Sequence, residues 1–181
     1  MSILINLLTV SRIIFAIIIF TLLMTPEGYF LALIFFFIAG ISDYFDGFLA
    51  RKYNKVSQFG EILDPIADKI LIVFAFFGLA VNLSSYFIAF LASFIIAREI
   101  WVGALRDINA RNNKSNVTKV TFLAKIKTTM QLFTIGTYLT ALTLNNMLLI
   151  TIADLLLFTS LIITLYTGLV YTLNSLTKGD F

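Results

Sequence analysis

Four aspartates lie at spacings that could build a site for divalent cations. Asp43 and Asp46 are three residues apart, and Asp64 and Asp68 are four residues apart. On a helix, either spacing puts both carboxylates on one face. Converging carboxylates repel one another unless a cation compensates them, and oxygen ligands without His or Cys favour Mg²⁺, Mn²⁺ or Ca²⁺. The structural alternative is that the aspartates form ion pairs with neighbouring basic residues. Because four acids lie in this arrangement, we favour the metal site over ion pairs.

Small residues next to the aspartates leave room for a phosphate or a nucleotide. Gly47 and Ala50 each lie one helical turn after an acid of the first pair, so this face of the helix lacks bulk. Arg51 follows directly and would supply positive charge and hydrogen-bond donors. Gly60 lies one turn before the second pair and clears the facing helix in the same way. The alternative explanation for the glycines is tight helix packing.

The composition limits both the chemistry and the fold class. The 181 residues are 60% hydrophobic and 13% charged, and they include no His and no Cys. Imidazole and thiolate chemistry and disulfides are therefore excluded. Soluble domains carry about 25% charged residues, so an ordinary soluble domain is excluded as well. The net charge is only +3, and the Lys and Arg residues form no continuous basic stripe. We therefore expect no nucleic-acid partner.

Six apolar segments predict an all-α, polytopic membrane protein with six transmembrane helices, because about 20 mostly apolar residues are enough to cross a bilayer. Basic residues gather in the connections 51–60 and 106–119, whereas the alternate connections hold almost none. This asymmetry places the basic connections and both termini in the cytoplasm. No repeat or linker divides the chain, so we expect one domain over residues 1–181. The predicted spans are residues 4–24, 30–50, 61–81, 85–106, 120–144 and 147–173.

Charged residues inside five of these segments lie at one depth. With a rise of 1.5 Å per residue, Asp43, Asp68, Arg98 and Lys125 lie about 9 to 12 Å from the expected cytoplasmic ends, and Arg12 falls in the same layer. A charge at membrane depth is costly and usually faces a cavity, a partner or an ion. The shared depth therefore predicts a polar cavity open to the cytoplasm. For the three basic residues the alternative is snorkelling, in which the long side chain reaches the interface.

The acidic motif resembles that of the CDP-alcohol phosphotransferase family. The matching residues are Asp43-x-x-Asp46-Gly47-x-x-Ala50-Arg51, then eight residues, then Gly60-x-x-x-Asp64-x-x-x-Asp68, and every fixed position is present. Other segments resemble the branch of this family that uses glycerol 3-phosphate as its acceptor. These are Asn6-Leu7-Leu8-Thr9 followed by Arg12, and residues 62–69, 97–100, 104–106 and 125–129.

This resemblance implies a six-helix enzyme of the bacterial inner membrane, usually a homodimer, with its active site facing the cytoplasm. It implies transfer of a phosphatidyl group from CDP-diacylglycerol to sn-glycerol 3-phosphate, two bound divalent ions (Mg²⁺ or Mn²⁺), and Asp68 as general base. The implied metal ligands are Asp43, Asp46, Asp64 and Asp68; the implied CDP-diacylglycerol ligands are Asn6, Asp43, Asp46, Gly47, Ala50, Arg51 and Gly60; and the implied glycerol-phosphate ligands are Arg98, Arg106 and Lys125.

Other functions stay open at this point. Another branch of the family would use inositol phosphate or, as in cardiolipin synthesis, phosphatidylglycerol as the acceptor. A separate basic group favours an acceptor that carries its own phosphate, since arginine suits phosphate geometry. A cation transporter with an acidic intramembrane site and a structural membrane protein are the alternatives from other classes. Glu61, Glu99 and Asp154 have no assigned role.

Overall fold

The computed structural model describes residues 2–53, 58–112 and 122–178, with side chains described for 7–43, 63–112 and 126–177. Within this part the chain forms six α-helices, one short 3-10 helix and no strand, so the all-α prediction is confirmed. The long helices coincide with the six predicted apolar segments. The elements are α1 (Ser2–Leu22), η1 (Pro26–Gly28), α2 (Tyr29–Tyr53), α3 (Gln58–Asn82), α4 (Tyr86–Arg111), α5 (Phe122–Leu144) and α6 (Met147–Lys178).

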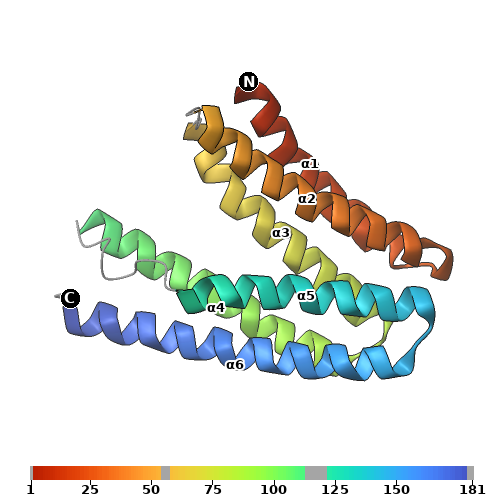
Figure 1. The fold of residues 1–181 in the computed structure, drawn as a ribbon. Helices are drawn as coiled ribbons and strands as arrows, with labels where there is room; N and C mark the ends of the chain where they lie inside the picture. The colour runs from red at the N-terminus through yellow and green to blue at the C-terminus, as the bar shows by residue number, and fades with distance from the viewer. Residues whose placement is uncertain (1, 54–57, 113–121, 179–181) are drawn as a thin grey trace.

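The helices run up and down in two groups, α1–α3 and α4–α6 (Figure 1). The start of α1 and the end of α6 lie at the same end of the bundle, and the two groups diverge toward that end. α1 packs against both α2 and α3, while α6 packs against both α4 and α5. In the described part, α2 and α3 make few direct contacts with each other. The first helix therefore connects the two helices that carry the acidic motif.

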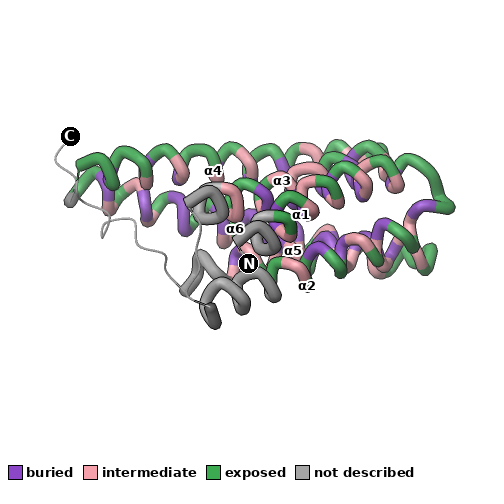
Figure 2. Tube along the Cα trace, turned by 90° about the horizontal axis from the view of Figure 1, so that it is seen from above, coloured by how far each residue is buried: buried purple, intermediate pink, exposed green. Residues whose placement is uncertain are grey.

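The outside of the bundle is apolar and part of its inside is polar. Exposed positions follow the outer sides of the helices and buried positions lie between them (Figure 2). Large apolar side chains such as Phe37, Phe90 and Leu155 are exposed, whereas Arg12 and Lys127 are buried. This is the reverse of a soluble protein, whose charged residues are almost always exposed. The chain is therefore an integral membrane protein.

Three helical segments in the described part are long and apolar enough to cross a membrane, fewer than the six that the sequence predicts. They are Pro26–Asp43, Tyr86–Arg111 and Met147–Thr177. α1 contributes a shorter apolar segment, Leu7–Leu22. α3 and α5 are not among these segments of the described part, and both helices carry charged residues in their first halves. Of these charged residues, Asp68 and Lys69 of α3 and Lys127 of α5 also line the candidate site.

The end of the bundle with the short connections is held by polar contacts. The side-chain amide of Asn82, at the end of α3, donates to the carbonyl oxygen of Leu23 at 2.6 Å and to the hydroxyl of Tyr29 at 2.8 Å. Further along the chain, the Tyr138 hydroxyl donates to Asp154 Oδ1 at 2.5 Å and joins α5 to α6. A buried polar group needs such a partner in an apolar surrounding. Asp154, which has no role assigned from the sequence, therefore has a structural contact that joins two helices.

The apolar core fills the half of the bundle nearer these connections. Gly78 of α3 faces α1 there, and a Cβ atom at this position would lie 2.8 Å from Leu23 Cδ1 and 3.5 Å from the Cα of Phe20. A Cβ atom at Gly40 of α2 would meet nothing within 4 Å. Gly78 thus permits the close approach of α1 to α3, and Gly40 has no such role.

We predict that Gly78→Leu destabilises the protein by about 1 to 3 kcal/mol, the usual cost of overpacking, because α1 and α3 must separate. Gly40→Leu is the matched control, since it makes the same change in a helix with open space beside it. Thermal denaturation of both purified variants in detergent measures the difference. Equal stability of the two variants would show that the α1–α3 contact does not need a glycine.

Candidate active site

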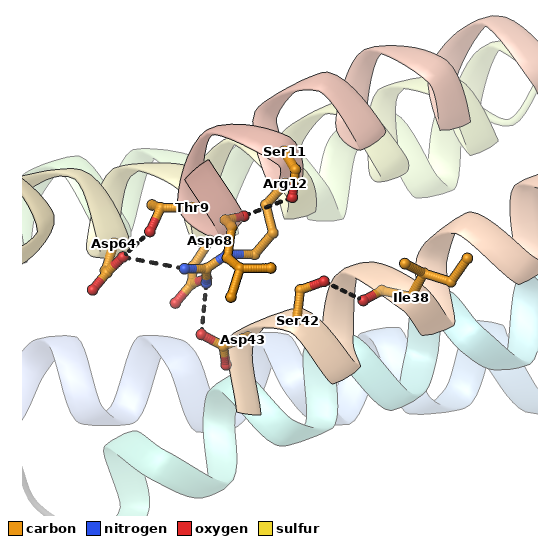
Figure 3. Close-up of polar contacts among 9 residues, drawn as sticks. Thr9, Ser11, Arg12, Ile38, Ser42, Asp43, Asp64 and Asp68 are labelled. Atoms are coloured by element: carbon orange, nitrogen blue, oxygen red, sulfur yellow. Dashed lines mark hydrogen bonds and ion pairs between the residues drawn. The ribbon is translucent and has the colours of Figure 1, made fainter. Parts of the chain in front are cut away.

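Arg12 of α1 lies at the centre of the acidic cluster (Figure 3). Its side chain is fully buried, and its guanidinium meets carboxylates from α2 and α3. Nη1 donates to Asp43 Oδ1 at 2.6 Å and also to Asp68 Oδ1, while Nη2 donates to Asp64 Oδ1 at 3.2 Å. The snorkelling alternative is therefore wrong for Arg12, whose charge is held inside the bundle.

The helical spacings explain how these side chains meet. Thr9 lies three residues before Arg12 on the same face of α1, and its hydroxyl donates to Asp64 Oδ1 at 2.6 Å. Asp64 and Asp68, four residues apart, lie on one face of α3 as predicted, and both reach Arg12. Asp43 approaches from α2 on the other side. The three described acids thus meet at Arg12 of α1, which lies between α2 and α3.

The charges and atoms of this cluster fit a divalent cation. In the part of the chain that the structure describes, one guanidinium faces three carboxylates, which leaves an excess of two negative charges, and the carboxylate side chains are 40–51% exposed. Oxygen donors of this kind match Mg²⁺ and Mn²⁺. Among the described side chains, no three acids surround a single ion position, because Arg12 lies between them.

Several predicted ligands lie outside the described side chains. They include the fourth acid of the motif and the small and basic residues expected to hold the CDP group, and they stay predictions. These residues are Asn6, Asp46, Gly47, Ala50, Arg51 and Gly60, together with Lys125 of the expected acceptor site.

A pocket of about 550 Å³ lies between α3, α4 and α5 and joins the acidic cluster to a set of basic side chains. Asp68 lines it on the side of the acids. Lys69, Arg106 and Lys127 line it from the three helices, together with Glu99. A pocket with a carboxylate and several cations in its wall can hold a phosphate next to a group that accepts a proton.

The predicted phosphate ligands differ in their positions. Arg106 lines the pocket, with its guanidinium carbon 5.3 Å from the ring centroid of Tyr171. Arg98 is not among the residues that line the pocket. Its guanidinium is buried and donates to Glu99 at 2.9 Å and to Thr167 at 2.7 Å. Snorkelling is therefore wrong for Arg98 too, and this side chain connects α4 to α6.

Three residues that the structure places here are not among the ligands predicted from the sequence: Arg12, Glu99 and Lys127. Arg12 had a usable signal, since an arginine inside the first apolar segment needs a counter-charge. Lys127 lies two residues after the predicted Lys125 and is 6% exposed. The only signal for Glu99 in the sequence was its neighbour Arg98. This signal is weak, because adjacent residues on a helix do not point in the same direction.

The fold and the site define a membrane-embedded helical protein with an acidic cluster beside a cationic pocket. Residues 2–166 match the CDP-alcohol phosphatidyltransferase family, and the chain belongs to this family. Members of this family use a divalent metal.

The chain is also similar to individual bacterial enzymes. It is 39% identical over 130 residues to the CDP-diacylglycerol–glycerol-3-phosphate 3-phosphatidyltransferase of Escherichia coli (strain K12). The matched region covers 70% of this chain and 71% of the relative. Proteins with the same description from Shigella flexneri serotype 5b (strain 8401) and Shigella sonnei (strain Ss046) show the same identity and coverage.

We predict that Arg12→Gln lowers the free energy of unfolding by about 2 to 3 kcal/mol when metal is chelated, because three carboxylates then face one another without a buried cation. Added Mg²⁺ should restore more stability to this variant than it adds to the wild type. Thermal denaturation with EDTA and with Mg²⁺ measures both effects. Arg111→Gln is the control, since Arg111 is 76% exposed and pairs only with Asp107 in the described part. The same Mg²⁺ response in all three proteins would contradict a metal site at these carboxylates.

Proposed function

We propose that this protein transfers the phosphatidyl group from CDP-diacylglycerol to sn-glycerol 3-phosphate and releases CMP. The observation that carries the proposal is the shared pocket: Asp68 of the acidic cluster lines the same cavity as Arg106 and Lys127. A phosphate bound to the two cations would hold the hydroxyl of the same small molecule near the carboxylate. Membership of the family and the similarity to the Escherichia coli enzyme support the same reaction.

The acceptor reacts through its 1-hydroxyl group. The hydroxyl oxygen forms a bond to the phosphorus that carries diacylglycerol, and the bond from that phosphorus to the bridging oxygen of CMP breaks. Asp68 accepts the hydroxyl proton, since it is the acid of the cluster that lines the pocket. Arg106 and Lys127 bind the acceptor's phosphate, and Arg98 and Lys125 stay predicted ligands of it.

The donor's pyrophosphate belongs on the acidic side of the pocket. Asp43, Asp46, Asp64 and Asp68 are the proposed ligands of two divalent ions, Mg²⁺ or Mn²⁺. Bound metal would neutralise the negative charge that develops as CMP departs. The proposed ligands of the CDP group are the small and basic residues of the motif: Asn6, Gly47, Ala50, Arg51 and Gly60.

The proposal includes the membrane topology and the oligomeric state of the enzyme. All six helices cross the bacterial inner membrane, both termini are cytoplasmic, and residues 1–181 form one domain that works as a homodimer. The basic residues of the connections 51–60 and 106–119 support this orientation. The pocket lies in the half of the bundle where the two described ends of the chain lie, which supports an active site on the same side as the termini.

An acceptor panel tests the reaction. Purified protein is incubated with labelled CDP-diacylglycerol, Mg²⁺ and either sn-glycerol 3-phosphate, inositol phosphate or phosphatidylglycerol, and CMP release is measured. We expect release with sn-glycerol 3-phosphate and loss of release with EDTA. Release with only inositol phosphate or phosphatidylglycerol would assign the protein to another branch of the family. Cation flux in vesicles without any CMP release would instead support a transporter.

We predict that Asp68→Asn lowers kcat by roughly 10²- to 10⁴-fold, the usual range for loss of a general base, while CDP-diacylglycerol still binds. The measurements are the rate of CMP release and the equilibrium binding of the donor lipid. Asp107→Asn is the matched control, because Asp107 is 59% exposed and pairs with Arg111 away from the pocket. A kcat near that of the wild type would remove Asp68 from the mechanism.

A further inference from the structure

Glu99 of α4 holds two cations with a single oxygen atom. Its Oε1 accepts hydrogen bonds from Lys127 Nζ of α5 and from Arg98 Nη1 of its own helix, the latter at 2.9 Å. Lys127 is buried and lines the pocket, whereas Arg98 is buried outside the lining. Glu99 therefore stands between a cation that lines the pocket and a cation that lies behind the lining.

Arg98 is itself fixed by α6. Its Nη2 donates to Thr167 Oγ1 at 2.7 Å, and its guanidinium carbon lies 5.9 Å from the ring centroid of Tyr171. The stem of Arg98 lies against Gly168, where an added Cβ atom would come within 3.0 Å of Arg98 Cγ. The contacts thus form a continuous series from α6 through Arg98 and Glu99 to Lys127. Arg98 is an anchor in this series, because both ends of its guanidinium have protein partners.

The charges around the pocket explain why such a series is needed. Lys69, Arg106 and Lys127 line the pocket, and Arg98 lies behind Glu99, so four cations share a small region. Like charges in an interior of low dielectric repel strongly. When no phosphate is present, the Lys127 ammonium would move away from the other cations unless an anion holds it. Glu99 makes this contact and is itself held by Arg98.

We propose that Glu99 is a positioning residue for the acceptor's phosphate: it fixes Lys127 in the pocket wall, and Arg98 and Thr167 anchor it to α6. This inference rests on the proposed function and adds a residue to it. Glu99 does not touch the phosphate in this proposal, because two anions would repel. It acts by keeping the cation in place before the acceptor arrives, which lowers the cost of ordering that side chain on binding.

Glu99→Gln separates positioning from simple charge attraction. The substitution makes the pocket more positive by one unit, so charge attraction predicts tighter binding of sn-glycerol 3-phosphate and a lower KM. Positioning predicts the opposite, because a neutral amide holds Lys127 and Arg98 less firmly. We expect the KM for sn-glycerol 3-phosphate to rise about 10-fold, with the KM for CDP-diacylglycerol changed less than twofold. Asp107→Asn, with the same change of charge on the same helix, should leave both KM values unchanged.

A double-mutant cycle tests whether Glu99 acts through Lys127. Lys127→Ala should raise the KM for sn-glycerol 3-phosphate by about 10-fold or more, and adding Glu99→Gln to it should have little further effect. Independent, additive effects of the two substitutions would overturn the proposal, as would an unchanged or lower KM in Glu99→Gln.

Thr167→Val, which changes no charge, provides a second test if Glu99→Gln does not fold, and we expect it to raise the same KM two- to fivefold. An unchanged KM in that variant would also overturn the proposal.

Failure of the inference can be distinguished from failure of the proposed function. If the wild type releases no CMP with sn-glycerol 3-phosphate, the proposed function is wrong, and calorimetry with inorganic phosphate still tests the pocket. We expect Glu99→Gln to bind inorganic phosphate about 10-fold more weakly than the wild type. Equal or tighter binding would overturn the role of Glu99 whatever the reaction is.

Discussion

The guanidinium of Arg12 is the constraint on which the site depends. A charged side chain that is fully buried in a membrane protein needs counter-charges, and Asp43, Asp64 and Asp68 supply them. These contacts set the positions of α2 and α3 relative to α1, because the carboxylates must reach one small group. They also place Asp68 where it borders the pocket between α3, α4 and α5. The positions of three helices and of the acid nearest the acceptor therefore follow from one ionic cluster.

Much of the acidic half of the site could be predicted from the sequence. Helical spacing placed Asp64 and Asp68 on one face, and the common depth of the charges placed Arg12 and Asp43 in the same layer. The same reasoning could not predict which helices pack against one another. Spacing within a helix does not say which helix packs against it, so the position of α1 against both α2 and α3 appeared only in the structure. Asp46 and its neighbours on the motif lie outside the described side chains and stay predictions.

The basic half of the site was harder to predict for a physical reason. Arginine and lysine side chains are long, so the position of a Cα atom leaves the position of the charge undetermined. Arg98 and Arg106 lie on the same helix, yet Arg106 lines the pocket and Arg98 bonds to Thr167 of α6. α6 carries no charged motif in this region, and its role became visible through Gly168 and Tyr171, which contact the arginines.

The order of Arg12 and its acids along the chain also affects how the protein is made. Its carboxylate partners follow 31, 52 and 56 residues later. In the proposed six-span arrangement, α1 therefore leaves the ribosome ahead of all three balancing acids, and an arginine at the centre of a membrane-spanning helix opposes insertion by about 2.5 to 3.5 kcal/mol. The third helix must emerge before all three acids are available. In that arrangement, stable insertion of α1 depends on the later arrival of α2 and α3, which bring the carboxylates to Arg12.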